Sequence, residues 1–300
     1  MNFRVADKTS SSDFTSRINA QNNRLNILQE QISTGKRINR SSDDPVGAEM
    51  VLNLRTSQTE IKQFQRNAQA ANQKLSAADD TLNNYENILE HVRTLVAQGL
   101  SDTTTQPARN NLATEIESLR GRILNVANSK NGDDYLFGGT RQNAPPFDST
   151  TATPANTPTT AQFIQIEPGS NAIAVGVTAE TVFSDSNSTV FTDLTNAIYA
   201  LRGTGNSTAD RTTLENTMSR LDIYKNQVNS AHAQIGANMN ETEAVTENLD
   251  NSFLLIDERA SEIEGADFAK TAIELADVQR SIEATLQVAA KGRRSLFDYL

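Results

Sequence analysis

The chain has 300 residues, enough for one large domain or two of ordinary size. Only 5% of the residues are aromatic and none is tryptophan, which disfavours a compact enzyme with an aromatic-walled pocket. A formal net charge of -10 disfavours a nucleic-acid-binding protein, because binding a phosphate backbone needs clustered lysine and arginine.

The sequence predicts no disulfide, no cleaved secretory signal and no membrane span. It contains no cysteine, so we expect neither disulfides nor a thiolate metal site. The N-terminal residues lack the apolar core of a cleaved secretory signal. No apolar run approaches the length of about eighteen residues that predicts a membrane span.

The first predicted element is a helix over residues 14–34, in which apolar residues are spaced alternately three and four apart. Gly35 follows it, and glycine readily takes the left-handed conformation that ends helices. After a loop, Asp44 and Pro45 have the residue types of an N-cap and a first helical position. A long heptad helix is therefore predicted over residues 45–98, with a length of roughly 80 Å.

A third helix is predicted from Pro107 to about residue 130, where Asn131 and Gly132 end the pattern. The character then changes, because residues 135–147 and 163–182 alternate apolar and polar side chains. A turn at residues 168–171 separates two short predicted strands. A loop rich in threonine and proline, residues 149–161, is expected to be exposed and to contribute nothing to the core.

Helical periodicity returns over residues 190–202 and 209–263, and a last helix is predicted over 267–300. The two long helices carry matching heptads, so we expect them to run antiparallel, with the third helix as a further partner. The predicted fold class is mainly α, a long antiparallel coiled-coil bundle with a small inserted β domain. The expected divisions are an N-terminal arm (1–44), two bundle parts (45–134 and 190–264), the β domain (135–189) and a C-terminal arm (265–300).

The two terminal arms carry the functional prediction. Each has an apolar stripe that requires a partner, and burial of each large side chain contributes about 1.5–3 kcal/mol. Polar residues such as Gln21 and Gln279 interrupt the stripes, and the sequence leaves open whether the arms pair with each other or only with neighbouring subunits. The predicted assembly interface consists of Phe14, Ile18, Leu25, Leu28, Ile32, Leu275, Ile282, Leu286, Leu296 and Leu300.

No catalytic or cofactor constellation is recognisable. His91 and His232 are the only histidines, and each falls on a long predicted helix without neighbouring metal ligands. The adjacent aspartates at 43–44 favour helix capping over acid–base chemistry, because neighbouring residues on a helix point in different directions. We therefore predict a protein that is not an enzyme and that has no cofactor or metal.

Two terminal segments resemble the flagellin family. Residues 32–39 (ISTGKRIN), followed by Ser-Asp-Asp-Pro at 42–45, are similar to its N-terminal signature, and residues 263–300 are similar to its C-terminal helix. Within the family, the Asp-Pro pair, the segment 135–147 (YLFGGTRQNAPPF) and the final Leu-Phe-Asp-Tyr-Leu resemble the hook-associated proteins of the hook–filament junction.

The resemblance implies a structural subunit, an adaptor between hook and filament in the secreted, extracellular flagellum. It implies a homo-oligomeric ring in contact with another hook-associated protein and with filament flagellin. It also implies type III export, with an export chaperone on the C-terminal helix beforehand. A filament flagellin is the first alternative and a soluble coiled-coil scaffold is the second; a scaffold would be a closed bundle, ordered at both ends when free.

Overall fold

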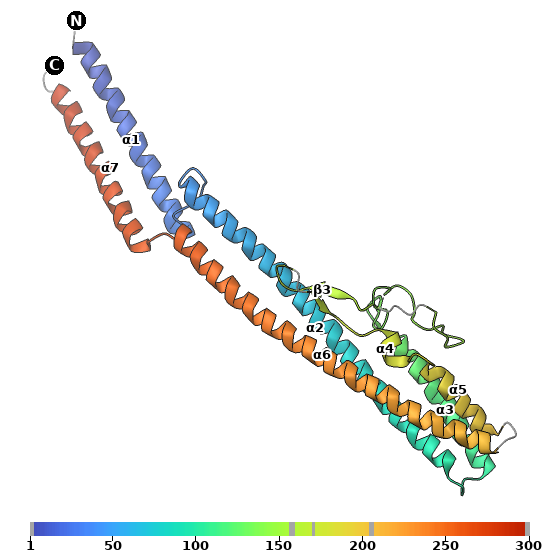
Figure 1. Ribbon diagram of the computed structural model, residues 1–300. Helices are drawn as coiled ribbons and strands as arrows, with labels where there is room; N and C mark the ends of the chain where they lie inside the picture. Colours follow the sequence, from blue (N-terminus) through green and yellow to red (C-terminus); the bar gives the residue numbers. More distant parts are fainter. Residues whose placement is uncertain (1–2, 156–159, 170–171, 204–206, 298–300) are drawn as a thin grey trace. The chain divides into compact units, whose positions relative to one another are not determined.

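The structure, a computed structural model, describes the backbone of residues 3–155, 160–169, 172–203 and 207–297, and their side chains except at 3–11, 207 and 289–297. Long helices dominate the described residues (Figure 1). They are α1 (Phe3–Thr34), α2 (Pro45–Leu100), α3 (Gln106–Ala127), α4 (Ala179–Phe183), α5 (Val190–Arg202), α6 (Ser207–Glu264) and α7 (Phe268–Phe297). The predicted fold class, mainly α with a small inserted β part, is confirmed.

The β part consists of two small antiparallel sheets within the described residues. Strand β1 (Lys130–Asn131) pairs with β2 (Asp134–Tyr135), and β3 (Phe163–Gln165) pairs with β4 (Ala172–Ala174). In the second hairpin Ile164 lies directly opposite Ile173, so the two side chains share one face of the hairpin.

Two asparagines from the long helices hold the β3–β4 hairpin. The side-chain amide of Asn67, on α2, donates to the carbonyl of Gln165 at 2.8 Å. The side-chain amide of Asn238, on α6, donates to the carbonyl of Ala174 at 2.7 Å. Each strand of the hairpin is thus tied at its outer edge to one long helix.

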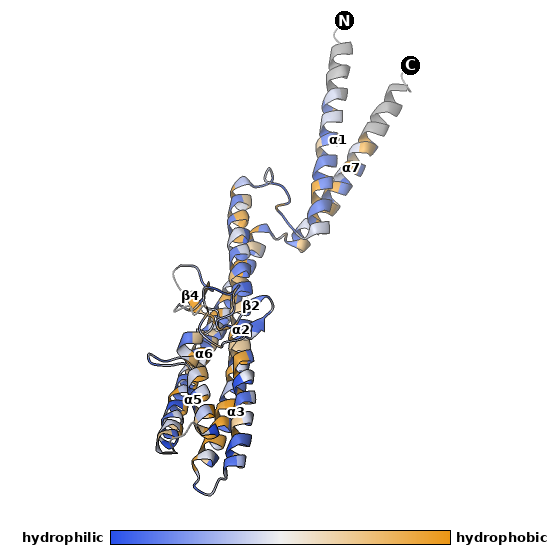
Figure 2. Ribbon diagram, turned by 90° about the vertical axis from the view of Figure 1, so that its right-hand side faces the viewer, coloured by the Kyte–Doolittle hydropathy of each residue, from blue (hydrophilic) through white to orange (hydrophobic). Residues whose placement is uncertain are grey.

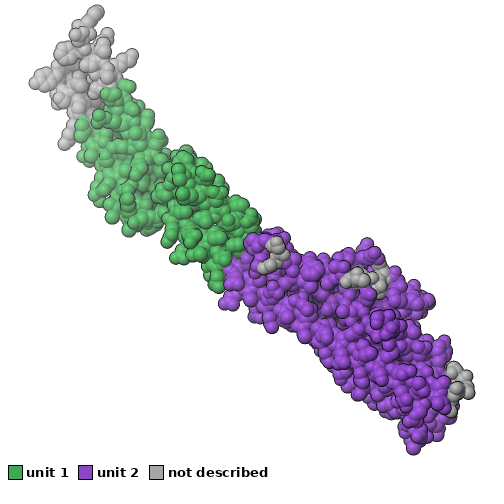
Figure 3. Space-filling view, viewed as in Figure 1, with its two compact units in different colours: residues 1–61, 251–300 green, residues 62–250 purple. Residues whose placement is uncertain are grey.

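The chain divides into two compact units, which Figure 3 shows in different colours. Unit 1 consists of residues 1–61 and 251–300, and unit 2 of residues 62–250. The divisions fall inside α2 and α6, and the five segments expected from the sequence remain a prediction.

The largest core lies in unit 2, where α2, α3, α5 and α6 meet the β part. Apolar residues, orange in Figure 2, gather along α3 in this region. Phe183 is the centre of an aromatic cluster, with ring centroids 4.5 Å from Tyr85, 5.2 Å from Phe137 and 6.1 Å from Phe147. Such tilted and edge-to-face contacts stabilise a core beyond the area they bury.

Three local expectations are wrong. The segment 163–182, in which alternation predicts β structure, ends in helix α4 (residues 179–183), whose buried members Ala179, Val182 and Phe183 have helical spacing. Helix α3 ends at Ala127, before the predicted residue 130, because strand β1 begins at Lys130. The loop 149–161 contributes to the core through Ala152, which is 2% exposed.

Candidate assembly surface

Unit 1 holds both terminal helices, and the loop between α1 and α2 fixes where they end and begin. Gly35 ends α1 with a φ of 70°, and its amide donates to the carbonyl of Gln31 at 2.9 Å. Asp44 caps α2 by accepting the amide of Gly47 at 3.0 Å, as its position before Pro45 predicts. Asp267 caps α7 in the same way through the amide of Lys270, also at 3.0 Å.

Helices α1 and α7 lie side by side, which answers the question that the sequence left open (Figures 1 and 2). The side-chain amide of Gln21 donates to the Ser281 hydroxyl at 2.7 Å. Arg24 forms an ion pair with Glu274, also at 2.7 Å. The Oε1 atom of Gln21 is buried and has no hydrogen-bond partner among the described residues, so this polar position satisfies only part of its hydrogen-bonding capacity.

The predicted interface residues differ in exposure. Leu28 is buried at 1% exposed, whereas Leu286 is 51% exposed. The remaining described members are half-buried: Phe14, Ile18, Leu25, Ile32, Leu275 and Ile282. Leu296 and Leu300 lie outside the residues whose side chains the structure describes. Most of the predicted stripe is therefore partly covered within one chain.

Unit 1 has other exposed apolar side chains besides Leu286. On the terminal helices these are Ile27, Phe268, Ile273 and Val288, and at the adjoining ends of the long helices they are Val46, Met50, Leu52, Leu254 and Leu255. Ile273 is 65% exposed and Val288 is 71% exposed. Met50 lies on the predicted heptad seam of the second helix, but the heptad misses the others because it selects residues that face a partner helix. Large apolar residues off the heptad are the signal that identifies an outward surface.

The electrostatics of unit 1 centre on the start of α2. Arg37 forms an ion pair with Asp44 at 3.1 Å, and the guanidinium also donates to the carbonyl of Ile263 at 3.0 Å. The pKa of the Asp44 carboxyl lies below its ordinary value, because the Gly47 amide and the Arg37 guanidinium both stabilise the charged form. The neighbouring Asp43 accepts the backbone amide of Arg40 at 2.8 Å, so it stabilises the turn before α2, and Asp44 alone of the two caps the helix.

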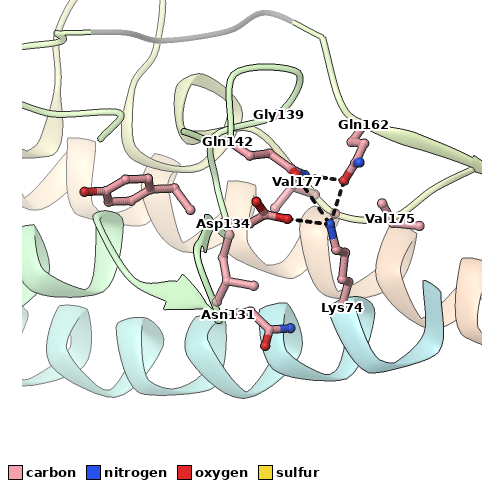
Figure 4. Close-up of a pocket in the computed structure, with 11 residues that line it drawn as sticks. Lys74, Asn131, Asp134, Gly139, Gln142, Gln162, Val175 and Val177 are labelled. Atoms are coloured by element: carbon pink, nitrogen blue, oxygen red, sulfur yellow. Dashed lines mark hydrogen bonds and ion pairs between the residues drawn. The ribbon is translucent and has the colours of Figure 1, made fainter. Parts of the chain in front are cut away.

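Unit 2 contains a small pocket beside the β part, and Figure 4 shows its lining. The ammonium group of Lys74 lies 3.1 Å from Asp134, 3.4 Å from the amide oxygen of Gln142 and 3.0 Å from that of Gln162. Three acceptors thus engage the three donors of this amine. Lys74 therefore links α2 to the β part.

Neither histidine belongs to a group of three or more possible metal ligands among the described residues. His91 lies 3.2 Å from Glu115, on the surface between α2 and α3. His232 on α6 binds Asp79 on α2 at 2.6 Å. Each pair joins two helices and thereby helps to hold the helical bundle together. None of the described helices combines the length and hydropathy needed to span a bilayer.

Comparison with known proteins matches both ends of the chain to one family. The model of the bacterial flagellin N-terminal helical region matches residues 5–142, and that of the bacterial flagellin C-terminal helical region matches residues 218–300. The flagellar hook-associated protein 3 of Escherichia coli is 28% identical over 235 residues, which are 72% of this chain and 74% of that protein. A flagellin of Listeria innocua is 25% identical over 91% of this chain and 90% of its own length.

Solved structures share the fold. The crystal structure of FlgL from Xanthomonas campestris aligns with a TM-score of 0.63 at 15% identity, covering 69% of this chain and 99% of that one. The flagellar hook-associated protein-3 from Legionella pneumophila aligns with a TM-score of 0.64 at 15% identity, covering 71% of this chain and 98% of that one. The paired terminal helices, the capped start of α2 and the two family matches agree, and the chain belongs to the flagellin family.

Proposed function

We propose that this chain is a structural subunit of the bacterial flagellum that serves as an adaptor at the hook–filament junction. The observation that carries the proposal is the similarity to hook-associated protein 3, which extends over most of both chains. Membership of the flagellin family makes the chain a component of the extracellular flagellum. The family consists of structural proteins, in agreement with a site composed of apolar side chains.

Assembly would bury the exposed apolar residues of unit 1 against other subunits. Ile273, Leu286 and Val288 are each at least half exposed on α7. Burial of each such side chain contributes about 1.5–3 kcal/mol. We propose that copies of this chain form a ring through these residues and those of α1, with another hook-associated protein on one side and filament flagellin on the other.

The same surface calls for protection before assembly. An amphipathic helix with large exposed apolar residues promotes association between unassembled chains. We propose that an export chaperone covers α7 until the chain is delivered through the type III route. A chaperone is expected to co-purify with the full chain and to be lost when α7 is deleted.

A filament flagellin is the second candidate, because the similarity to the Listeria flagellin extends over nearly the whole chain. Immunogold electron microscopy of intact flagella, with antibody against unit 2, separates the two. A single labelled band where hook meets filament supports the adaptor. Label along the whole filament supports the filament subunit, and unlabelled flagella would contradict both and support a soluble scaffold.

A substitution in α7 tests the assembly surface. Leu286→Asp places a charge at a half-exposed apolar position and is expected to abolish incorporation into flagella while unit 2 stays folded. Gln287→Asp adds the same charge at the neighbouring exposed position and is the matched control. Equal loss of incorporation in both variants would show that added charge, and not the Leu286 position, is responsible.

A further inference from the structure

Glu264 is the last residue of α6, and two other segments of unit 1, the loop after α1 and helix α2, converge on it where the chain continues toward α7. Its Oε1 atom lies 3.0 Å from the ammonium of Lys36, in the loop after α1. Its Oε2 atom lies 2.5 Å from the guanidinium of Arg55, on α2. Its backbone carbonyl accepts the amide of Arg37 at 2.6 Å. The residue thus contacts the loop, α2 and the connection to α7 at once.

The position of Glu264 is unfavourable for α6 on its own. The C-terminal end of a helix carries partial negative charge, so an acidic side chain there is destabilising unless cations offset it. The Glu264 side chain is only 14% exposed, whereas those of Lys36 and Arg55 are 39% and 49% exposed. The carboxylate is therefore the buried centre of the group, and the two cations reach it from solvent.

The backbone around Glu264 joins the same segments. Lys36 and Gly265 form an isolated antiparallel bridge, and the amide of Ala266 donates to the carbonyl of Gly35 at 2.9 Å. This bridge links the end of α1 to the start of α7 next to the carboxylate. Charge and backbone contacts thus act on one short connection between the terminal helix pair and the long helices of unit 1.

We propose that Glu264 is a positioning residue for assembly, which holds the connection between the terminal helix pair and α2 in one arrangement through Lys36 and Arg55. The part that concerns assembly rests on the proposed function. Without the carboxylate, both cations remain solvated, and the connection keeps its backbone contacts and the hydrogen bond from the Arg37 guanidinium to the carbonyl of Ile263. The terminal pair then samples other arrangements and presents its apolar surface less often in the geometry that a neighbouring subunit requires. Because the two cations are partly exposed, salt should weaken the contact.

The test measures the connection directly. The chain has no cysteine, so a cysteine pair introduced at the exposed Asn26 on α1 and Asn53 on α2 accepts spin labels at those positions only. Pulsed electron paramagnetic resonance then gives the distribution of distances between the labels. Glu264→Gln should increase the population outside the main distance by about fivefold, the change expected for loss of a partly exposed ion pair. High salt should broaden the parent distribution and leave that of Glu264→Gln unchanged.

Control variants keep the result decisive. Glu262→Gln removes the charge of an exposed glutamate one position from Ile263 and should leave the distribution as in the parent. The double substitution Lys36→Gln with Arg55→Gln removes the contact from the other side and should broaden the distribution as Glu264→Gln does. An unchanged distribution in Glu264→Gln, or broadening in Glu264→Gln but not in the double variant, would overturn the proposal. Glu264→Asp, which retains the charge, should restore most of the parent behaviour.

Incorporation into flagella is the second readout. Glu264→Gln should lower incorporation into flagella as well as broaden the distance distribution, whereas Glu262→Gln should do neither. Broadened distances with normal incorporation would overturn the role in assembly. If the parent chain itself never joins flagella, the proposed function is wrong, and the distance measurement still decides whether Glu264 positions the terminal pair.

Discussion

The hydroxyl of Tyr224, on α6, donates a 2.6 Å hydrogen bond to the carboxylate of Asp193, on α5. Arg220 also pairs with Asp193, and its guanidinium reaches Asp185 at 2.8 Å. The Asp193 side chain is 8% exposed and that of Arg220 is 20% exposed. A mostly buried ionic network thus joins α5 to α6 at the edge of the main core. Burial and the hydrogen bond to Asp193 raise the pKa of Tyr224 well above its ordinary value, so the phenol stays a donor.

Removal of the cation from this network should strongly destabilise unit 2. Arg220→Ala leaves the Asp193 carboxylate buried without its charged partner, and we expect a loss of about 3–5 kcal/mol in the free energy of unfolding. Urea denaturation followed by circular dichroism measures it. Arg122→Ala, at an exposed position on α3, should change stability by no more than about 0.5 kcal/mol. Similar effects of both substitutions would refute the importance of the network.

Substitution by alanine should have opposite effects on stability at Gly47 and at Gly121. A Cβ on Gly47 would lie 2.6 Å from the Cδ1 atom of Ile38 and 2.7 Å from the Oδ2 atom of Asp44. Gly47→Ala should therefore destabilise the start of α2 by about 1–3 kcal/mol. A Cβ on Gly121, within α3, would have no heavy atom within 4 Å, so Gly121→Ala should stabilise by about 0.4–1 kcal/mol. Thermal unfolding of both variants is the measurement, and stabilisation by Gly47→Ala would contradict the close packing.

Two adjacent residues on α1 should separate folding from assembly. Leu28 is 1% exposed, so Leu28→Ala should destabilise the terminal helix pair by about 2–5 kcal/mol. Ile27 is 42% exposed, so Ile27→Ala should have little effect on the free chain and should weaken incorporation into flagella. Hydrogen exchange of α1 amides reports the first effect and immunogold labelling the second. Loss of α1 protection in Ile27→Ala would show that this side chain belongs to the fold of the free chain.

The start of α2 should weaken in acid. The folded-state pKa of Asp44 is lowered from an ordinary value of about 3.9. The capping and ion-pair contribution is therefore complete above that value and is lost as the pH falls through the lower folded-state pKa. Carbon-13 NMR of the Asp44 carboxyl gives the titration directly. Asp44→Asn retains a capping oxygen but removes this pH dependence, and an unchanged acid response in that variant would assign it to another group.

Much of the fold follows from sequence pattern, and the exceptions have physical causes. Helix α5 begins and ends at the predicted residues 190 and 202, because its apolar spacing and the flanking Gly203 agree. Helix α4 lies at the end of a segment whose alternation predicts β structure, because five residues are too few to separate alternation from helical spacing. The heptad marks Tyr224 as a bundle residue, but no local pattern predicts its partner Asp193, which lies 31 residues away.

The assembly surface, too, is only partly predictable from the sequence. Leu28, a seam residue of the heptad, is buried within one chain because a seam residue faces the neighbouring helix, and its place in the assembly interface remains a prediction. The heptad does not select Phe268 or Ile273, whose exposure depends on which side of α7 is covered by α1. That choice is made by tertiary contacts such as the Gln21–Ser281 hydrogen bond, and a single sequence does not contain it. Which of these residues meet a neighbouring subunit remains a prediction.

The asparagine ties of the β3–β4 hairpin matter most when many copies of the chain are crowded together. A two-stranded sheet has two open edges, and open edges recruit strands from other molecules. Here the side-chain amides of Asn67 and Asn238 each donate to one backbone carbonyl on an open edge, so these two carbonyls have partners without a third strand. The proposed assembly through the terminal helices gains from this arrangement, because side-chain amides that oppose strand addition leave helix packing as the favoured mode of association.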